Sequence, residues 1–216
     1  MPGVITKTKH GSTRARQKPF RGRPLAAAFF ERDPLTVATE LVGCWLVATS
    51  GRDMVGGPIV ETEAYDEHDP ASHSYGGLRP RNTVMFGPPG YLYVYKIYGM
   101  HWCMNISTGP RGFGAAVLLR AIAPLLGSDT MHARRGPRIS ERDLARGPGR
   151  LCAALGVDDA LQGHRVNRAP LSVYAPHAPV SSIRRTPRVG ISKNKDLRWR
   201  CVLRDSPWSS GPAKWR

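Results

Sequence analysis

The sequence predicts an α+β fold: a single domain with a mixed, largely antiparallel curved β-sheet, flanked by helices and carrying a protruding β-hairpin. Segments rich in aromatic and β-branched residues, which favour strands, dominate the centre of the chain. Apolar residues recur at helical spacing before and after that centre. The two kinds of element do not alternate as regular βαβ units, so the class is α+β. A length of 216 residues suits one domain.

The N-terminal region divides into a tail and the start of this domain. Residues 1–24 are polar, basic and rich in Gly, Pro, Ser and Thr, so we expect a disordered tail and a folded domain over residues 25–216. Asp33 followed by Pro34 is a helix-start signal, because it combines an N-cap carboxylate with a proline in the first turn. Apolar residues then repeat at helical spacing up to a predicted stop at Gly43.

Two strands, a long loop and a hairpin follow. Residues 44–49 and 58–65 have the composition of strands, whereas residues 66–89 contain repeated Pro and Gly. A loop of that length inside a compact domain is usually functional. Residues 91–98 and 101–108 predict two antiparallel strands that turn at Gly99 and Met100.

The tip of this hairpin has an unusual composition. Hairpin tips in water usually carry Asn, Asp, Gly or Ser, but this one carries Tyr98, Met100, His101 and Trp102. Such groups either pack back onto the same molecule or contact a partner. The base stack of DNA is one possible partner, because inserted side chains unstack and kink the duplex. The hairpin alone favours packing onto the core, since aromatic runs are more often core than contact surface.

The second half of the chain contains weaker signals. Residues 115–123 predict a central strand in which Arg120 is the single charged residue. Helical spacing resumes over residues 125–135, and Ser140 with Asp143 resembles a capping box. A short helix is predicted within residues 146–157, opened at Pro148 and closed by Gly156. Three further strands are expected at residues 171–175, 188–191 and 198–203.

The charge balance points to a polyanionic partner. The chain has 32 Lys and Arg against 16 Asp and Glu, a net charge of +16. The tail holds seven of these cations and no acid, so the folded domain is basic in its own right. Nucleic acid fits this charge better than a membrane, because no amphipathic basic helix is evident. A biased amino-acid composition is the alternative explanation. The four cysteines show no metal-binding spacing, which indicates buried free thiols in a reducing compartment.

Two carboxylates stand out as candidates for chemistry. Side chains alternate along a strand, so Glu61, Glu63 and Tyr65 share one face of the strand at residues 58–65. Neighbouring carboxylates repel each other, and burial would raise the pKa of at least one. The alternative is a solvated strand face that carries two ordinary acids.

Several blocks of sequence together resemble one family of DNA-repair enzymes. The blocks are IVETEAY at residues 59–65, ASHSYGG at 71–77, PRN at 80–82, MFGPPGYLYVYKIYGMHWCMNIS at 85–107, VLLRA at 117–121 and LARGPGRLC at 144–152. In this order they resemble the alkyladenine, or 3-methyladenine, DNA glycosylases of base excision repair, over about residues 29–208. Such an enzyme flips one nucleotide out of duplex DNA and cuts the bond between base and sugar.

The resemblance implies roles for the residues of the site. Glu63 matches the general base that activates a water to attack C1′, and Arg120 matches the arginine that helps hold this water. Glu61 is not the catalytic carboxylate of the family pattern. A substrate pocket is implied at Tyr65, His73, Tyr95, Asn105 and Val189, where aromatic faces suit cationic alkylated bases and Asn105 crowds the amine of normal guanine.

The resemblance also implies how DNA is held. Tyr98 matches the side chain that fills the gap left in the base stack, with Met100 beside it. Phosphate contacts are expected from the hairpin, from the loop before residue 82 and from a helix N-terminus, which favours anions. The residues concerned are Arg79, Arg81, His101, Gly147 and Arg150.

Water as the nucleophile makes the expected enzyme monofunctional, because the sequence shows no lysine placed to attack C1′. No metal cluster or nucleotide-binding loop is present in the pattern, so no cofactor is expected. The expected partner is double-stranded DNA that contains 3-methyladenine, 7-methylguanine, hypoxanthine or ethenoadenine, with no membrane partner and the enzyme a monomer. We expect it in the cytoplasm at the nucleoid of a bacterium, or in the nucleus if the source is eukaryotic. A non-catalytic damaged-DNA-binding protein and an RNA-acting protein remain as alternatives.

Overall fold

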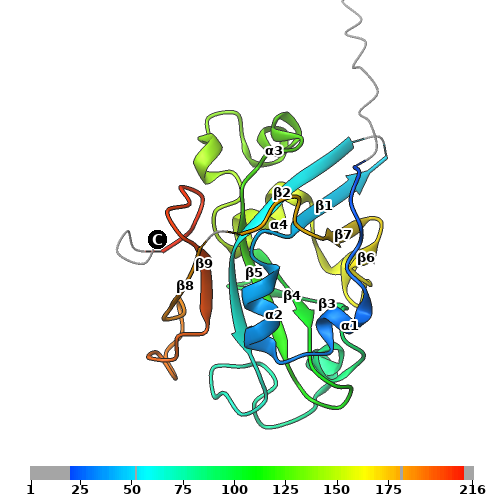
Figure 1. The fold of residues 1–216 in the computed structure, drawn as a ribbon, viewed down its shortest axis with the longest axis vertical. Coiled ribbons are helices and arrows are strands. Elements are labelled where there is room, and N and C mark those ends of the chain that lie inside the picture. Colours follow the sequence, from blue (N-terminus) through cyan, green and yellow to red (C-terminus); the bar gives the residue numbers. More distant parts are fainter. Residues whose placement is uncertain (1–19, 52, 181, 212–216) are drawn as a thin grey trace, which may run out of the picture.

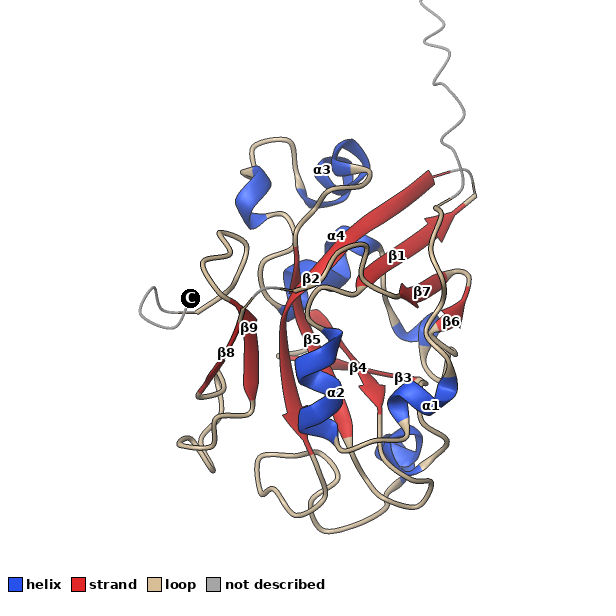
Figure 2. Cartoon of the chain, viewed as in Figure 1, coloured by secondary structure: helices blue, strands red, loops and turns tan. Residues whose placement is uncertain are grey.

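The computed structural model describes residues 20–51, 53–180 and 182–211, and its strands form one nine-stranded curled sheet in which every pairing of described strands is antiparallel (Figures 1 and 2). The strand order is β3-β4-β5-β2-β1-β7-β6. In addition, β9 pairs with the second half of β2 on the edge opposite β5, and β8 pairs with β9. This arrangement confirms the predicted α+β class. The strands are β1 (Trp45–Ser50), β2 (Asp53–Tyr65), β3 (Leu92–Ile97), β4 (His101–Ser107), β5 (Ala116–Ile122), β6 (Asn167–Arg168), β7 (Leu171–Tyr174), β8 (Ile183–Thr186) and β9 (Arg200–Leu203).

Short helices pack around the sheet, and none of those described is long and apolar enough to cross a bilayer. The α-helices are α1 (Ala27–Phe30), α2 (Pro34–Leu41), α3 (Ser128–Arg135) and α4 (Pro148–Leu155). Three 3-10 helices add η1 (Pro80–Phe86), η2 (Glu141–Asp143) and η3 (Asp159–Leu161). In Figure 1, α2 lies against β2 and β5 near the middle of the molecule, and α3 lies at the opposite end from the long loop between β2 and β3.

The strand β2 is the centre of the sheet and is longer than predicted. Its first half pairs with β1, and its second half pairs with β5 on one edge and with β9 on the other. Glycines weaken a strand signal in sequence, but here they permit a close approach of the backbone. A Cβ at Gly56 would lie 2.2 Å from the carbonyl oxygen of Leu46, and one at Gly57 would lie 1.7 Å from that of Ala123.

Alternation of side chains along three neighbouring strands separates the core from a cavity. In β3, β4 and β5, one set of side chains joins the main apolar core together with residues of α2 and α4; these are Leu92, Val94, Met104, Ile106, Val117 and Leu119. The intervening side chains line a cavity on the other face; these are Tyr93, Tyr95, Cys103, Asn105, Leu118 and Arg120. One sheet therefore supplies both the stability of the domain and the wall of its site.

The helix signals were confirmed in part. Asp33 caps α2, since its carboxylate accepts the N–H of Thr36 at 2.9 Å. The helix expected over residues 125–135 begins only at Ser128, because residues 125–126 are extended and Leu126 bridges to Gly56. The predicted capping box at Ser140 does not form: its hydroxyl donates to the Asp143 carboxylate at 3.0 Å instead of bonding a backbone N–H.

The strand predicted at residues 188–191 is wrong. The partner of β9 is β8, which ends at Thr186, directly before Pro187. Proline has no N–H to donate, and the N–H of Val189 donates to Glu63 instead of to a strand. Residues 187–199 thus form the connection between β8 and β9, and part of it lines the cavity.

The last residues of the predicted tail contact the folded body. The tail was expected to be disordered over residues 1–24, of which residues 1–19 lie outside the described residues. Residues 20–24 lie along β7, where the carbonyl of Arg23 accepts the N–H of Ala175 at 2.9 Å. The ring of Phe20 packs on Tyr174, with centroids 4.8 Å apart, and on Trp45 at 5.1 Å.

Candidate active site

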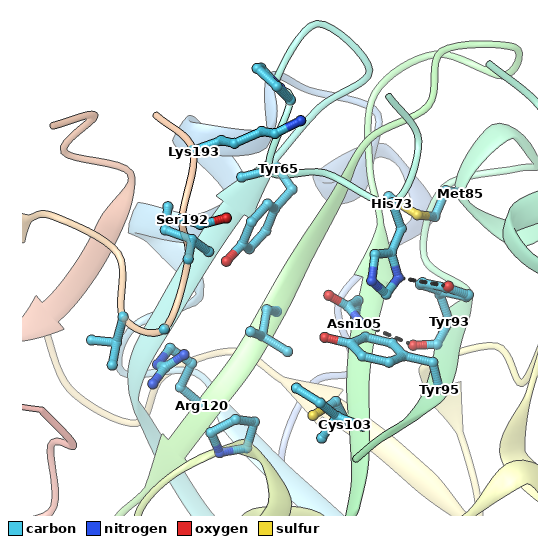
Figure 3. A pocket seen from close by; sticks show the side chains of 18 of the residues that line it. Tyr65, His73, Met85, Tyr93, Tyr95, Cys103, Asn105, Arg120, Ser192 and Lys193 are labelled. Carbon is cyan, nitrogen blue, oxygen red and sulfur yellow. Dashed lines mark hydrogen bonds between the residues drawn. The ribbon is translucent and has the colours of Figure 1, made fainter. Parts of the chain in front are cut away.

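A cavity of about 470 Å³ opens on the face of β3, β4 and β5 that is turned away from the core. The end of β2, the loop from residue 66 to residue 91, the connection between β8 and β9, and the start of α4 complete its walls. Figure 3 shows Tyr65 on one side of this space and His73 with Tyr95 on the other. The volume and aromatic lining suit a small planar ligand.

The aromatic wall is a connected set of side chains. The ring centroids of His73 and Tyr95 are 4.5 Å apart, and those of Tyr93 and Tyr95 are 5.5 Å apart. His73 Nδ1 is 2.9 Å from the Tyr93 hydroxyl, which fixes the imidazole ring. Burial, helped by nearby Arg81, holds the pKa of His73 below its usual value, so the ring is neutral at pH 7.

A buried asparagine holds His73 at the cavity. The side-chain amide of Asn82 donates to the carbonyl of His73 at 2.9 Å, and its oxygen accepts the N–H of Arg79 at 2.7 Å. The hydroxyl of Ser74 donates to the Gly114 carbonyl at 2.7 Å. The long loop is therefore ordered by its own polar side chains, which is how it can carry a site residue.

Asn105 lies at the base of the aromatic wall, where it is almost fully buried. Its side-chain N–H donates to the carbonyl of Tyr93 at 3.2 Å. This bond fixes the amide, so one end of any planar ligand in the cavity meets a polar group that cannot rotate away.

Glu63 is buried, and three donors reach its carboxylate. Its Oε2 accepts the Tyr65 hydroxyl at 2.9 Å and Arg120 Nη1 at 3.0 Å. Its Oε1 accepts the backbone N–H of Val189 at 2.7 Å. Burial and the adjacent carboxylate raise the pKa of Tyr65, so the phenol stays protonated and donates. The alternative of a solvated strand face is wrong, because Glu61 is buried as well.

The three donors to Glu63 all belong to residues that line the cavity, but Glu63 itself lies just behind that lining. A carboxylate has about four acceptor positions, and three are used here. One position on Oε1 remains for a further donor. Hydrogen bonds of catalytic groups are often incomplete in a free enzyme, so this geometry is compatible with a base that acts once substrate is bound.

Glu61 has a different environment although it lies only two residues away. Its carboxylate accepts from Arg120 Nε and Arg200 Nε, each at 2.7 Å, and from the hydroxyl and N–H of Ser210 at 2.8 and 2.5 Å. Burial alone would raise the pKa of Glu61, but Arg120 and Arg200 overcome this and lower it to about 2. Register shifts between β2 and β5 occur on both sides of Glu61. Such irregularities redirect side chains.

A buried arginine joins three of the walls. Arg188 donates to the carbonyl of Ala64 at 3.0 Å and forms an ion pair with Asp69 on the long loop. Its guanidinium lies over the Tyr65 ring, 4.5 Å from the centroid. The next residue is Val189, so this arginine also places the N–H that bonds Glu63. The sequence analysis placed Val189 in the substrate pocket, and the structure adds that its N–H donates to Glu63.

The hairpin tip projects from the body. Tyr98 and Met100 are 80% and 68% exposed, which excludes the alternative in which they pack onto the core. Tyr98 has a positive φ of 52°, a conformation that non-glycine residues seldom adopt. Tyr98 also lines the rim of the cavity. Trp102, which the sequence placed at the same tip, is half-buried and packs against the core.

The residues expected to contact phosphate lie on two sides of the cavity. Arg79 and Arg81 are exposed beside His73. On the other side, a Cβ at Gly149 would lie 3.1 Å from His101, so the start of α4 abuts the hairpin near Gly147. Arg150 is exposed but shares its charge with Asp143, at 2.9 Å.

Several groups of the site were missed in the sequence, among them Tyr93, Ser210 and Lys193. Tyr93 shares a strand face with Tyr95, so strict use of alternation would have found it. Ser210 gave no signal, because its contacts come from residues about 90 and 149 positions away. Lys193 lines the cavity near Tyr65 (Figure 3). It lies in a connection without periodicity, where sequence gives no spatial information.

Comparison with known proteins identifies a family. The sequence profile of the family described as methylpurine-DNA glycosylase (MPG) matches residues 28–207. A protein of Nitrosospira multiformis is 48% identical over 183 residues, which cover 85% of this chain and 92% of the relative. A protein of Methanoculleus marisnigri is 48% identical, covering 86% and 98%, and one of Nitrobacter winogradskyi is 45% identical, covering 90% of each chain. The names of all three include 3-methyladenine DNA glycosylase.

Proposed function

The chain belongs to the methylpurine-DNA glycosylase family, and from this premise we propose that it hydrolyses the N-glycosidic bond of alkylated or deaminated purines with a water that Glu63 activates. At the level of the family, it is a 3-methyladenine DNA glycosylase of base excision repair, a monofunctional DNA N-glycosylase whose substrate is damaged DNA. The main support for the proposed role of Glu63 is the position of its carboxylate, which lies directly behind an aromatic cavity and is held by three donors that line this cavity.

In the proposed reaction, Glu63 accepts a proton from water while the water oxygen attacks C1′ and the base departs. The free acceptor position on Oε1 is where we place this water. Arg120 donates to the carboxylate at 3.0 Å and the Tyr65 hydroxyl donates at 2.9 Å, so both fix its position for the incoming water. Because Glu63 lies behind the cavity lining, a small shift of a wall residue must admit the water. The product is an abasic site.

The cavity supports a purine stacked between Tyr65 and the wall formed by His73 and Tyr95. Aromatic faces attract cationic bases such as 3-methyladenine and 7-methylguanine. A neutral His73 does not repel them. Neutral damaged purines such as hypoxanthine and ethenoadenine gain the stacking alone. The fixed amide of Asn105 supports its proposed role of rejecting the exocyclic amine of normal guanine.

We assign the exposed hairpin tip to DNA. Tyr98, with Met100 beside it, would occupy the gap that the flipped nucleotide leaves, at the rim of the cavity that receives the base. Exposed side chains on both sides of that rim would hold the flanking phosphates. These are Arg79, Arg81, His101 and Arg150, together with the N-terminus of α4 at Gly147.

We also propose an oligomeric state and a cellular location for the enzyme. The enzyme would act as a monomer, because the residues proposed for base release and for DNA contact all belong to a single chain that could perform the reaction by itself. It would work at the nucleoid of a bacterial cell, where four buried free cysteines suit a reducing compartment. The alternative of a binding protein without catalysis does not explain why the carboxylate behind the cavity keeps an arginine and two other donors.

Release of free base tests the proposal. Duplex oligonucleotides that each carry one hypoxanthine, ethenoadenine or 7-methylguanine are incubated with the full chain, and both the free base and the alkali-labile abasic site are quantified. We expect base release from at least one of the three duplexes and no strand cleavage before alkali. Tight binding to all damaged duplexes without any free base would establish the non-catalytic alternative.

A further inference from the structure

A buried cluster of charges behind the cavity contains more residues than the proposed reaction uses. Two carboxylates, Glu61 and Glu63, face two guanidinium groups, Arg120 and Arg200, and all four are buried. Charges balance within the cluster, which lowers the cost of burying it. Of the four, only Arg120 lines the cavity among the described residues. Glu61 and Arg200 therefore need a role other than contact with the base.

Glu61 is bound too completely to act as a base. Its Oε1 accepts three donors, at 2.7, 2.7 and 2.8 Å, and its Oε2 accepts the N–H of Ser210 at 2.5 Å. Glu61 does not line the cavity, and its donors are Arg120, Arg200 and Ser210. A carboxylate held in this way is an anchor for the groups that donate to it.

The main group anchored in this way is Arg120. Its planar guanidinium donates through Nε to Glu61 at 2.7 Å, through Nη1 to Glu63 at 3.0 Å and through Nη2 to the Ser210 hydroxyl at 3.2 Å. Three donors in a rigid fork, each with its own acceptor, fix both the position and the tilt of the plane. The Ser210 hydroxyl bonds both Glu61 and Arg120, so it closes the ring of contacts on the side away from Glu63.

Ser210 is itself held in place by arginines. Arg200 Nη2 donates to its carbonyl at 2.6 Å, and Arg146 Nε donates to the carbonyl of Ser209 at 2.8 Å. Arg142 Nε donates to the carbonyl of Pro207 at 3.0 Å. The segment from residue 206 to residue 210 is thus tied to the body by its backbone, and this leaves the Ser210 side chain fixed toward Arg120.

We propose that Ser210 is a positioning residue for base release: together with Glu61 and Arg200 it sets the orientation of Arg120, and through Arg120 that of the Glu63 carboxylate. The inference rests on the proposed function, because it assumes that Glu63 activates the water. Ser210 does not touch the substrate, and the bonds made and broken are those of the hydrolysis already described.

The neighbouring serine provides a matched control. Ser209 is also buried, but its hydroxyl has no hydrogen-bond partner among the described residues. Ser210→Ala and Ser209→Ala therefore remove the same atom from adjacent positions, and only the first removes bonds to Glu61 and Arg120. Single-turnover base release is measured on whichever damaged purine the unsubstituted enzyme releases fastest, and the Kd for the same duplex is measured in parallel.

We expect Ser210→Ala to lower the single-turnover rate about 10-fold, since hydrogen bonds to charged groups are the stronger ones, and to leave Kd within about 2-fold. Ser209→Ala should change neither quantity by more than about 2-fold, and Ser210→Thr, which keeps a hydroxyl, should recover most of the rate. Equal rates for the two alanine variants would overturn the inference. So would a loss in Ser210→Ala that appears equally in Kd and in thermal stability. Failure of the proposed function would look different, because Glu63→Gln would then release base as fast as the unsubstituted enzyme.

Discussion

The buried charged cluster behind the cavity, here termed the floor, comprises Glu61, Glu63 and Arg120. It differs from the hairpin tip at Tyr98 and Met100 both in burial and in the number of bonds that hold its side chains. In the floor, each charged group is buried and bound by at least three partners. At the tip, large side chains are 80% and 68% exposed. Groups that must hold a water at a fixed distance need a rigid and dry setting. Side chains that insert into another molecule must instead be exposed and make few contacts within their own protein.

The largest expected effect tests the floor. Glu63→Gln keeps the size of the side chain, but it removes the charge and presents an N–H₂ group to at least one of the three donors. General-base catalysis contributes about 10²–10⁴-fold, so single-turnover base release should fall by at least about 100-fold. Binding to a damaged duplex should stay within a few-fold of the original, because the cavity lining is unchanged.

Thermal unfolding of Glu63→Gln serves as the control, since the residue is buried. Glu61→Gln should be milder, because it leaves the water-activating carboxylate in place. Release by a folded Glu63→Gln variant at a rate within about 10-fold of the original would assign the base to another group.

The tip should show a smaller effect that depends on the substrate. Flipping costs a few kcal/mol of stacking and pairing, and one base–aromatic stack contributes roughly 1–3 kcal/mol. Tyr98→Ala should therefore slow release from a well-paired lesion by about 5- to 150-fold. It should matter least where the same lesion is mismatched, whereas Glu63→Gln should affect both duplexes alike.

Single-turnover rates on the two duplexes separate the two regions. Tyr98 is exposed, so its removal should not change the melting temperature of the protein, which is measured alongside. An equal loss on paired and mismatched lesions would show that Tyr98 does not act as a wedge.

Sequence predicted the floor better than it predicted the walls. The alternation that places Glu61, Glu63 and Tyr65 on one strand face is a local property of β2, and the hydrogen bond between Tyr65 and Glu63 confirms it. The central strand with its single charged residue, Arg120, was found from another local property, its nearly continuous apolar run. Local periodicity thus predicts which side chains share a strand face, but it does not predict which distant residues contact them.

The walls depend on contacts that no local pattern encodes. Lys193, Arg188 and Ser210 reach the site from loops or chain ends, across more than 80 residues in each hydrogen-bonded case. The strand expected at residues 188–191 does not form, because the N–H of Val189 donates to the carboxylate of Glu63, which is distant in sequence. Motif resemblance supplied candidates for Val189 and Asn105, but not the geometry that holds them.

A pH effect of moderate size should arise in the cavity. Burial, helped by nearby Arg81, holds the pKa of His73 below its usual value, so lowering the pH from neutral converts a neutral wall into a cationic one. Burial raises the pKa values of Tyr93 and Tyr95, so both stay neutral, and Glu61 with a pKa of about 2 stays ionised. A cationic lesion should therefore lose more than a neutral one. We expect kcat/KM for 7-methylguanine relative to hypoxanthine to fall about 10-fold between pH 7.5 and 5, the effect of a like charge a few ångströms away.

His73→Gln supplies the control for this effect, because an amide does not titrate in that range. Its ratio of kcat/KM values should be independent of pH. A ratio that falls equally in both proteins would place the titrating group elsewhere, in the substrate or in another residue.

The smallest expected effect on base release comes from the N-terminal tail, a region that belongs to neither the floor nor the tip. Deletion should stop at residue 19, because Phe20 packs on Trp45 and Tyr174 and its loss would disturb the body. The deleted part carries Lys7, Lys9, Arg14, Arg16 and Lys18. Each phosphate contact contributes about 0.9 to the salt dependence of binding, so the slope of log K against log salt should change by at most about 4.5. Release at saturating DNA should stay the same, since cavity and tip are intact.

Binding to undamaged duplex is measured over a series of salt concentrations, with release rates at saturation as the second reading. An unchanged slope would show that the tail does not contact DNA, and a reduced rate at saturation would show that it also acts on the cavity or the tip.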